Sequence, residues 1–144
     1  MQTQAYLFVH FKEKKTPDGE QVYFALSVDG FRWEQANDGK PILESRLGEQ
    51  GVRDHTIVRA KNGKFYILST DLSLANCFHT KYRGDWNNIA TEGSKHLALW
   101  ESSDLVNWSD QRLLKLGDDS FGCLWAPDVI YDPLLDDYVL HWSS

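Results

Sequence analysis

Two aspartates, Asp54 and Asp128, stand ahead of strand-like runs that match one another, and carboxylates in such positions can do acid–base chemistry. The run after Asp54 leads to Tyr66, and the run after Asp128 leads to Tyr138 in the same way. An ionised carboxylate held beside a water molecule can take its proton as a general base. An aspartate ahead of a strand can equally cap a turn, and the residues taken alone favour this structural role for Asp54.

Two further side chains could contact a small polar ligand. Asp71 ends a strand-like run, where its carboxylate could accept a hydrogen bond from a ligand hydroxyl or cap a turn, and the turn is favoured. His10 lies in another such run and could face a channel shared by several strands, although a lone histidine is more often a packed residue. Both are candidate binding residues.

The sequence predicts no metal and no cofactor. Its His, Cys and carboxylate residues are not grouped with the spacing of a zinc site. Cys77 and Cys123 lie far apart, and we expect buried thiols rather than a disulfide framework.

Charge and hydropathy argue against two classes of partner. A formal net charge of −6 leaves too little positive charge to displace the counterions of a nucleic acid. No run approaches the roughly 20 apolar residues that cross a bilayer. The first residues lack the basic and apolar regions of a signal peptide. We therefore expect a cytoplasmic protein with no nucleic-acid and no membrane partner.

The elements that must position the candidate side chains are strands. Short runs rich in β-branched and aromatic residues alternate with Gly, Asn and Asp turn residues, which predicts an all-β fold. The predicted strands cover residues 5–11, 22–28, 56–60, 65–70, 97–101, 112–116, 128–131 and 138–142. The segment 76–95 is too long for a tight hairpin, and could be either a loop at the rim of a pocket or a disordered insertion.

A repeat links distant parts of the chain. Asp29 and Asp104 are 75 positions apart in similar surroundings, as are Trp33 and Trp108. A second pair of similar runs is offset by 72 positions: Ile57-Val58 before Tyr66, and Val129-Ile130 before Tyr138. Two nearly equal offsets indicate a repeating four-stranded antiparallel unit, as in the blade of a β-propeller. Chance similarity among aromatic strands is the alternative.

We interpret residues 1–144 as one incomplete propeller domain, which the repeat divides into one complete and two partial blades. Residues 5–48 supply three strands of a blade, 52–117 a complete blade, and 124–144 the first two strands of the next. A propeller needs about four blades or more to close. With about two and a half blades per chain, a homodimer could complete a five-bladed ring.

Four motifs in fixed order resemble the N-terminal portion of glycoside hydrolase family 43; they occupy residues 51–59, 63–72, 99–109 and 122–132. The resemblance implies a partial five-bladed β-propeller and, as ligand, an oligosaccharide containing arabinose or xylose. It also implies an enzyme that removes arabinofuranosyl or xylosyl units from plant polysaccharides with inversion. Members of this family use an Asp general base, a second Asp that tunes pKa and orientation, and a Glu general acid.

Of the three carboxylates, only the base maps onto this sequence, at Asp54. The family commonly has proline after the base, whereas His55 stands here. Proline would restrict Asp54 toward extended geometry, so His55 is expected to alter the backbone at this point. The other two carboxylates belong to later blades beyond Ser144, so the chain alone is expected to be inactive.

The resemblance also implies that Trp125 and Asp128 line the sugar pocket. The equally supported alternative is that Trp125 is a core residue beside a turn-ending proline. Whether the chain is an enzyme therefore stays open, since it could instead be a non-catalytic carbohydrate-binding or assembly module built on the propeller scaffold.

Overall fold

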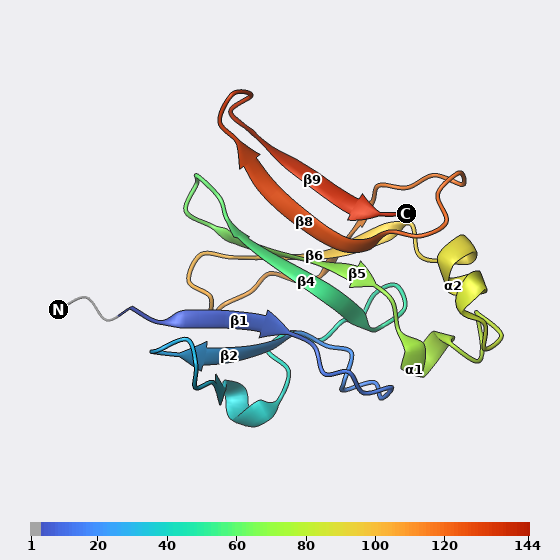
Figure 1. Ribbon diagram of the computed structural model, residues 1–144, viewed down its shortest axis with the longest axis horizontal. Helices are drawn as coiled ribbons and strands as arrows, with labels where there is room; N and C mark the ends of the chain where they lie inside the picture. The colour runs from blue at the N-terminus through green and yellow to red at the C-terminus, as the bar shows by residue number, and fades with distance from the viewer. Residues whose placement is uncertain (1–3) are drawn as a thin grey trace.

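The computed structural model describes residues 4–144 as three antiparallel sheets with two short helices beside them (Figure 1). In each sheet the strand order follows the chain. The first sheet holds β1 (Tyr6–His10), β2 (Tyr23–Ser27) and β3 (Glu34–Gln35). The second holds β4 (Val52–Arg59), β5 (Phe65–Asp71), β6 (His96–Ser102) and β7 (Arg112–Lys115). The third holds β8 (Trp125–Asp132) and β9 (Asp137–Ser143).

All eight predicted runs coincide with strands, which confirms the all-β class. β4 and β8 each begin earlier than predicted, at Val52 and Trp125, because each contains an irregularity near its start. β3 was not predicted. Its two polar residues, Glu34 and Gln35, have little strand preference and depend on pairing with β2.

Two turns that lie 75 residues apart in the sequence have the same hydrogen bonds. After β2, the Ser27 hydroxyl accepts the N–H of Gly30 at 2.8 Å. The Asp29 carboxylate accepts the N–H groups of Phe31 and Arg32 at 2.8 Å each. After β6, the Ser102 hydroxyl and Asp104 accept the corresponding N–H groups at 2.7 to 2.9 Å. The same short sequence thus forms the same turn in two successive sheets.

The three sheets stack face to face, with the second in the middle. Apolar side chains of the first and second sheets form one core cluster: Val22, Phe24, Leu43, Val52, Ile67, Ala98 and Trp100. A second cluster lies between the second and third sheets, built on Leu68, Leu97, Leu99 and Leu124 with Val129, Leu140 and Trp142 packed against it. Through this stacking the first strands of the sheets, β1, β4 and β8, lie side by side (Figure 1).

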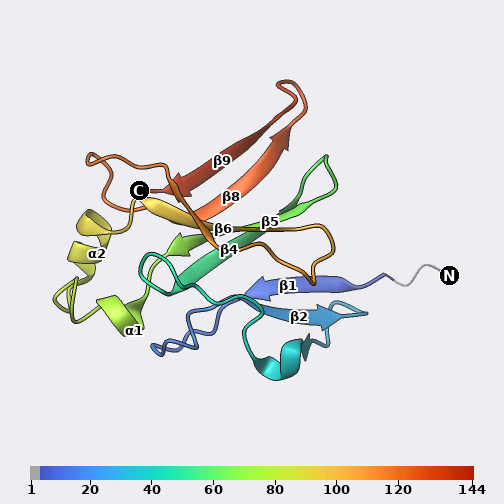
Figure 2. The same cartoon turned by 180° about the vertical axis from the view of Figure 1, so that it is seen from behind.

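The segment 76–95 is ordered, which rejects the disordered alternative. It contains the end of α1 (Leu74–Cys77) and all of α2 (Trp86–Glu92), and both views place these helices at one end of the four-stranded sheet (Figure 1 and Figure 2). Tyr82 and Ile89 are fully buried and anchor the segment. Within residues 4–144, no helix has the length and apolar character needed to cross a membrane.

The outer faces of the first and third sheets carry exposed apolar side chains. Leu7 and Val9 of β1 pack inward, so the alternating residues Tyr6 and Phe8 point the other way and are about half exposed. On the third sheet, Ile130 and its partner Val139 are exposed in the same manner. Both outer faces therefore resemble the inner ones in composition but lack a covering layer within the described residues.

Candidate functional site

Asp54 lies near the start of β4 with its backbone in the left-handed region. Its φ is +50°, and the strand pairing shifts between Arg53 and Thr56, so Asp54 sits in a β-bulge. Ala126, 72 positions later, has a φ of +48° in the equivalent bulge of β8. Positive φ costs about 1–3 kcal/mol in a non-glycine residue, and such strain gathers at functional sites. The two bulges thus turn two equivalent residues outward, Asp54 from β4 and Ala126 from the neighbouring β8.

A buried threonine connects the two bulges. Thr70 of β5 donates its hydroxyl hydrogen to Oδ2 of Asp54 at 3.1 Å. The same hydroxyl oxygen accepts the N–H of Ala126 at 2.8 Å. Asp54 itself is exposed. Its Oδ2 atom is therefore bonded to the protein while the rest of the side chain stays open to solvent.

His55, which stands where the resemblance predicts a proline, is held from both sides. Ser69 Oγ lies 2.7 Å from Nδ1, and the Gln21 carbonyl lies 3.4 Å from Nε2. Burial lowers the pKa of His55 to about 4; the nearby His10 adds to this effect, while the hydrogen bond to Gln21 opposes it. The neutral ring therefore carries its hydrogen on Nε2, since a carbonyl can only accept, and Nδ1 accepts from Ser69.

The expected backbone change at His55 is not supported by the equivalent position. Ala126 precedes Pro127 and still has a positive φ, close to that of Asp54. The bulge thus sets the conformation of both residues, whether proline or histidine follows. What histidine adds is a pair of hydrogen bonds that proline cannot make.

The neutral state of His55 makes the chain's stability depend on pH. The unfolded histidine takes a proton near pH 6.5, whereas the folded one resists until about pH 4. Acidification from pH 7 to pH 5 should therefore reduce the free energy of unfolding by up to about 2 kcal/mol through this residue. Urea unfolding at both pH values, compared with a His55→Gln variant, measures this contribution. An equal pH response of the two proteins would contradict it.

The start of β4 is fixed by a buried ion pair. Arg53 Nη1 lies 3.6 Å from Oε1 of Glu20, and its Nη2 also bonds the exposed Glu13. Glu20 accepts the Ser73 hydroxyl at 2.8 Å and the N–H groups of Leu74 and Ala75 at 2.8 and 3.1 Å. One carboxylate thus ties the strand that carries Asp54 to the first turn of α1.

Asp128 and Trp125 lie on the next first strand, near Asp54 along the stack. Asp128 is exposed, accepts the Thr56 hydroxyl at 3.0 Å, and lies 3.8 Å from Nε2 of His141. Trp125 is half-buried and packs against the cluster of Leu72, Leu74, Tyr82 and Ile89. Thr56 and Asp128 are themselves 72 positions apart, so equivalent positions of β4 and β8 contact each other.

Among residues 4–144, neither Asp71 nor His10 makes a hydrogen bond to Asp54 or Asp128. Asp71 is buried; it accepts the Glu49 N–H at 2.9 Å and the Ser94 hydroxyl at 2.6 Å, and burial raises its pKa. A Cβ at Gly48 would collide with its carboxylate. His10 stacks on Phe8 with ring centroids 5.0 Å apart, and its buried Nε2 has no hydrogen-bond partner among residues 4–144. The geometry of Asp71 is that of a packing residue.

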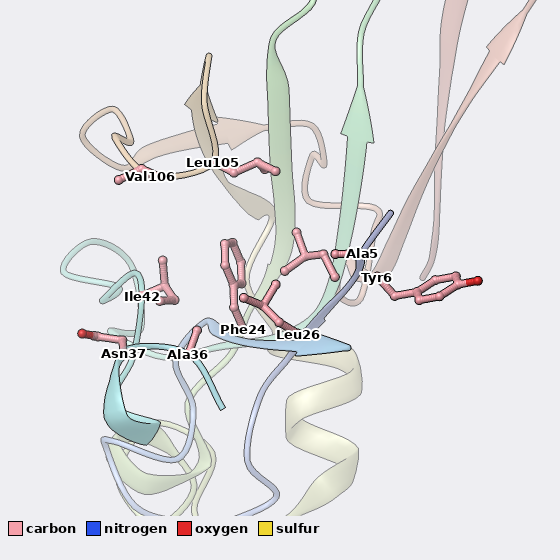
Figure 3. Close-up of a pocket in the computed structure, with 10 residues that line it drawn as sticks. Ala5, Tyr6, Phe24, Leu26, Ala36, Asn37, Ile42, Leu105 and Val106 are labelled. Atoms are coloured by element: carbon pink, nitrogen blue, oxygen red, sulfur yellow. The ribbon is translucent and has the colours of Figure 1, made fainter. Parts of the chain in front are cut away.

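A separate groove lies between the first sheet and the turn after β6, with a volume of about 660 Å³. Figure 3 shows Phe24 and Leu26 on one side of it and Leu105 and Val106 on the other. Its lining is almost entirely apolar and includes none of the candidate residues. A sugar needs several hydrogen-bond partners, so this groove does not suit one.

The residues that sequence reasoning missed are those that support Asp54. Thr70, Ser69, Arg53 and Glu20 are ordinary polar residues whose partners lie on other elements. The 72-residue offset was the available signal, since it pairs Asp54 with Ala126 and would have identified two equivalent bulges. Within the described part of the chain, no group of three or more His, Cys, Asp and Glu side chains could hold a metal ion.

Comparison with known proteins identifies relatives of this chain. The family profile that matches residues 2–144 is described as a probable glycosyl hydrolase domain and carries a name that relates it to glycosyl hydrolase family 43. An α-L-arabinofuranosidase of Bifidobacterium longum subsp. longum is 26% identical over 140 residues. That match covers 92% of this chain and 12% of the relative, so the chain spans a small part of the relative's length.

Solved structures share the fold. The GH43 protein BlXynB of Bacillus licheniformis superposes with a TM-score of 0.60 and 16% identity, over 99% of this chain and 25% of that protein. A point mutant of the same protein gives the same values. The three stacked antiparallel sheets therefore correspond to part of a larger family 43 structure.

Proposed function

This chain belongs to the family of probable glycosyl hydrolase domains related to family 43, and from that premise we propose that it is the base-bearing part of a glycoside hydrolase. The linkages proposed are arabinofuranosyl or xylosyl, supported by the arabinofuranosidase relative. The observation that carries the proposal is the geometry of Asp54. It is an exposed carboxylate on a first strand, turned out by a strained bulge and held by a buried hydroxyl.

In this mechanism Asp54 takes a proton from water as the water attacks the anomeric carbon. A protonated acid on the opposite face of the sugar gives its proton to the leaving oxygen. In inverting enzymes the two carboxyl groups stand roughly 6.5–9.5 Å apart, which leaves room for the water. The acid is proposed to come from further sheets that are not among these 144 residues.

The exposed outer sheet faces support a second role, assembly. We propose that this chain contributes about two and a half blades of a five-bladed propeller, and that further sheets cover Tyr6 and Phe8 at one face and Ile130 at the other. Those sheets come either from further residues of a longer chain or from a second copy in a homodimer. A non-catalytic carbohydrate-binding or assembly module would use the same faces without the chemistry.

Substrates that differ only in their leaving group separate these roles. Fluoride leaves without a proton, whereas methoxide needs an acid, whose contribution is about 10²- to 10⁴-fold. The chain should therefore hydrolyse an arabinofuranosyl or xylosyl fluoride with inversion, and should leave the methyl glycosides intact. Proton NMR of the product anomers measures both outcomes. Binding of an arabinose- or xylose-containing oligosaccharide without fluoride hydrolysis would establish the non-catalytic module instead.

The mass of the species that hydrolyses the fluoride must also be measured. Light scattering during the fluoride assay distinguishes a monomer from a dimer. Hydrolysis of fluorides and methyl glycosides at similar rates by a monomer would contradict the proposal that a single chain lacks the acid. If the species with that activity had the mass of a dimer, the acid would come from the second copy.

A further inference from the structure

The hydroxyl of Thr70 has a single hydrogen, and the structure determines where it goes. The N–H of Ala126 approaches the oxygen at 2.8 Å and occupies one of its lone pairs. Because an amide can only donate there, the hydroxyl hydrogen is left for Oδ2 of Asp54 at 3.1 Å. The residue is 0% exposed, so water does not compete for either bond.

This arrangement distinguishes the two oxygens of Asp54. Oδ2 is an acceptor already engaged by Thr70, and a proton placed on it would compete with that bond. No hydrogen bond from residues 4–144 engages Oδ1 in the same way, while the side chain as a whole is exposed. Oδ1 thus keeps both of its lone pairs available for a proton, whereas Thr70 occupies one lone pair of Oδ2.

We propose that Thr70 is a positioning residue for Asp54, fixing Oδ2 so that Oδ1 faces the attacking water. This inference rests on the proposed function. It also links the third sheet to the reaction, because the main chain of β8 at Ala126 sets the direction in which the Thr70 hydroxyl points. The contact joins β4, β5 and β8 at one oxygen atom.

A matched pair of variants tests this role. Thr70→Val keeps the shape of the side chain and removes the hydroxyl, whereas Thr70→Ser keeps the hydroxyl. In solution NMR, three-bond couplings should report one Asp54 rotamer in the wild type and in Thr70→Ser, and averaged rotamers in Thr70→Val. The Ala126 amide should exchange about fivefold faster in Thr70→Val, as for the loss of one hydrogen bond of about 1 kcal/mol.

The glycosyl fluoride assay adds a readout that a purely structural role would not move. In Thr70→Val, kcat/KM should fall about 5- to 30-fold, mainly in kcat. Thr70→Ser should restore the rate. A change confined to KM, or equal losses in the two variants, would overturn the positioning role.

The NMR measurements decide the inference even if no fluoride is hydrolysed. A single unchanged Asp54 rotamer in Thr70→Val would overturn it. If that variant does not fold, the wild-type chain still tests the bridge, because rotamer averaging at its Thr70 or Asp54 would be incompatible with the two hydrogen bonds. Absence of hydrolysis together with the expected rotamer changes would count against the proposed function alone.

Discussion

An Asp54→Asn variant is expected to hydrolyse glycosyl fluorides about 10²- to 10⁴-fold more slowly than the wild type while keeping its fold. Asparagine has the same shape as aspartate and can still accept the Thr70 hydroxyl, but it cannot take a proton from water. Removal of a positioned general base typically costs a factor of this size. Initial rates of fluoride release, with unfolding midpoints for both proteins, measure the effect.

Asp118→Asn is the matched control for this experiment. Asp118 is also exposed and also accepts a hydroxyl, that of Ser120 at 2.5 Å, but it lies in the loop before β8 and in neither bulge. Its variant should retain wild-type rates. Unchanged hydrolysis in Asp54→Asn would remove Asp54 from the mechanism.

A Glu20→Ala variant is expected to lose about 3–5 kcal/mol of unfolding free energy, because it breaks a buried charge pair. Glu20 is 1% exposed, and the side chain of its partner Arg53 is 11% exposed. Truncation leaves the guanidinium without its buried partner. It also leaves the Ser73 hydroxyl and two N–H groups at the start of α1 without their acceptor.

Glu13 offers a control on the same guanidinium. It also bonds Arg53, but its side chain is 72% exposed, so Glu13→Ala should cost less than about 1 kcal/mol. Urea unfolding at pH 7 measures both variants against the wild type. Similar losses for the two glutamates would show that burial of Glu20 does not govern its contribution.

The strands were predictable because each carries its own apolar and turn pattern. Ile57 and Val58 of β4, or Asn62 and Gly63 in its hairpin, need no distant partner to be recognised. The helices were missed for the opposite reason. α1 and α2 have four and seven residues, too short to be stable alone, and they depend on tertiary partners such as Glu20 and Tyr82.

The candidate site was predictable only in part. Asp54 stood out through its motif, but its conformation comes from a bulge that no local pattern announced. Thr70 reads in the sequence as one more β-branched strand residue. Its importance comes from contacts 16 and 56 positions away, which only the folded chain brings together.

The chain-order arrangement of strands within each sheet has a consequence for biosynthesis. Every sheet is made from one continuous segment, so all its pairings become available as soon as that segment has emerged from the ribosome. Domains generally fold as units during synthesis, beginning at the N-terminus, and short sequence separations between contacts speed folding. The first sheet can therefore form and offer its inner face as a template before the residues of β8 and β9 have been translated.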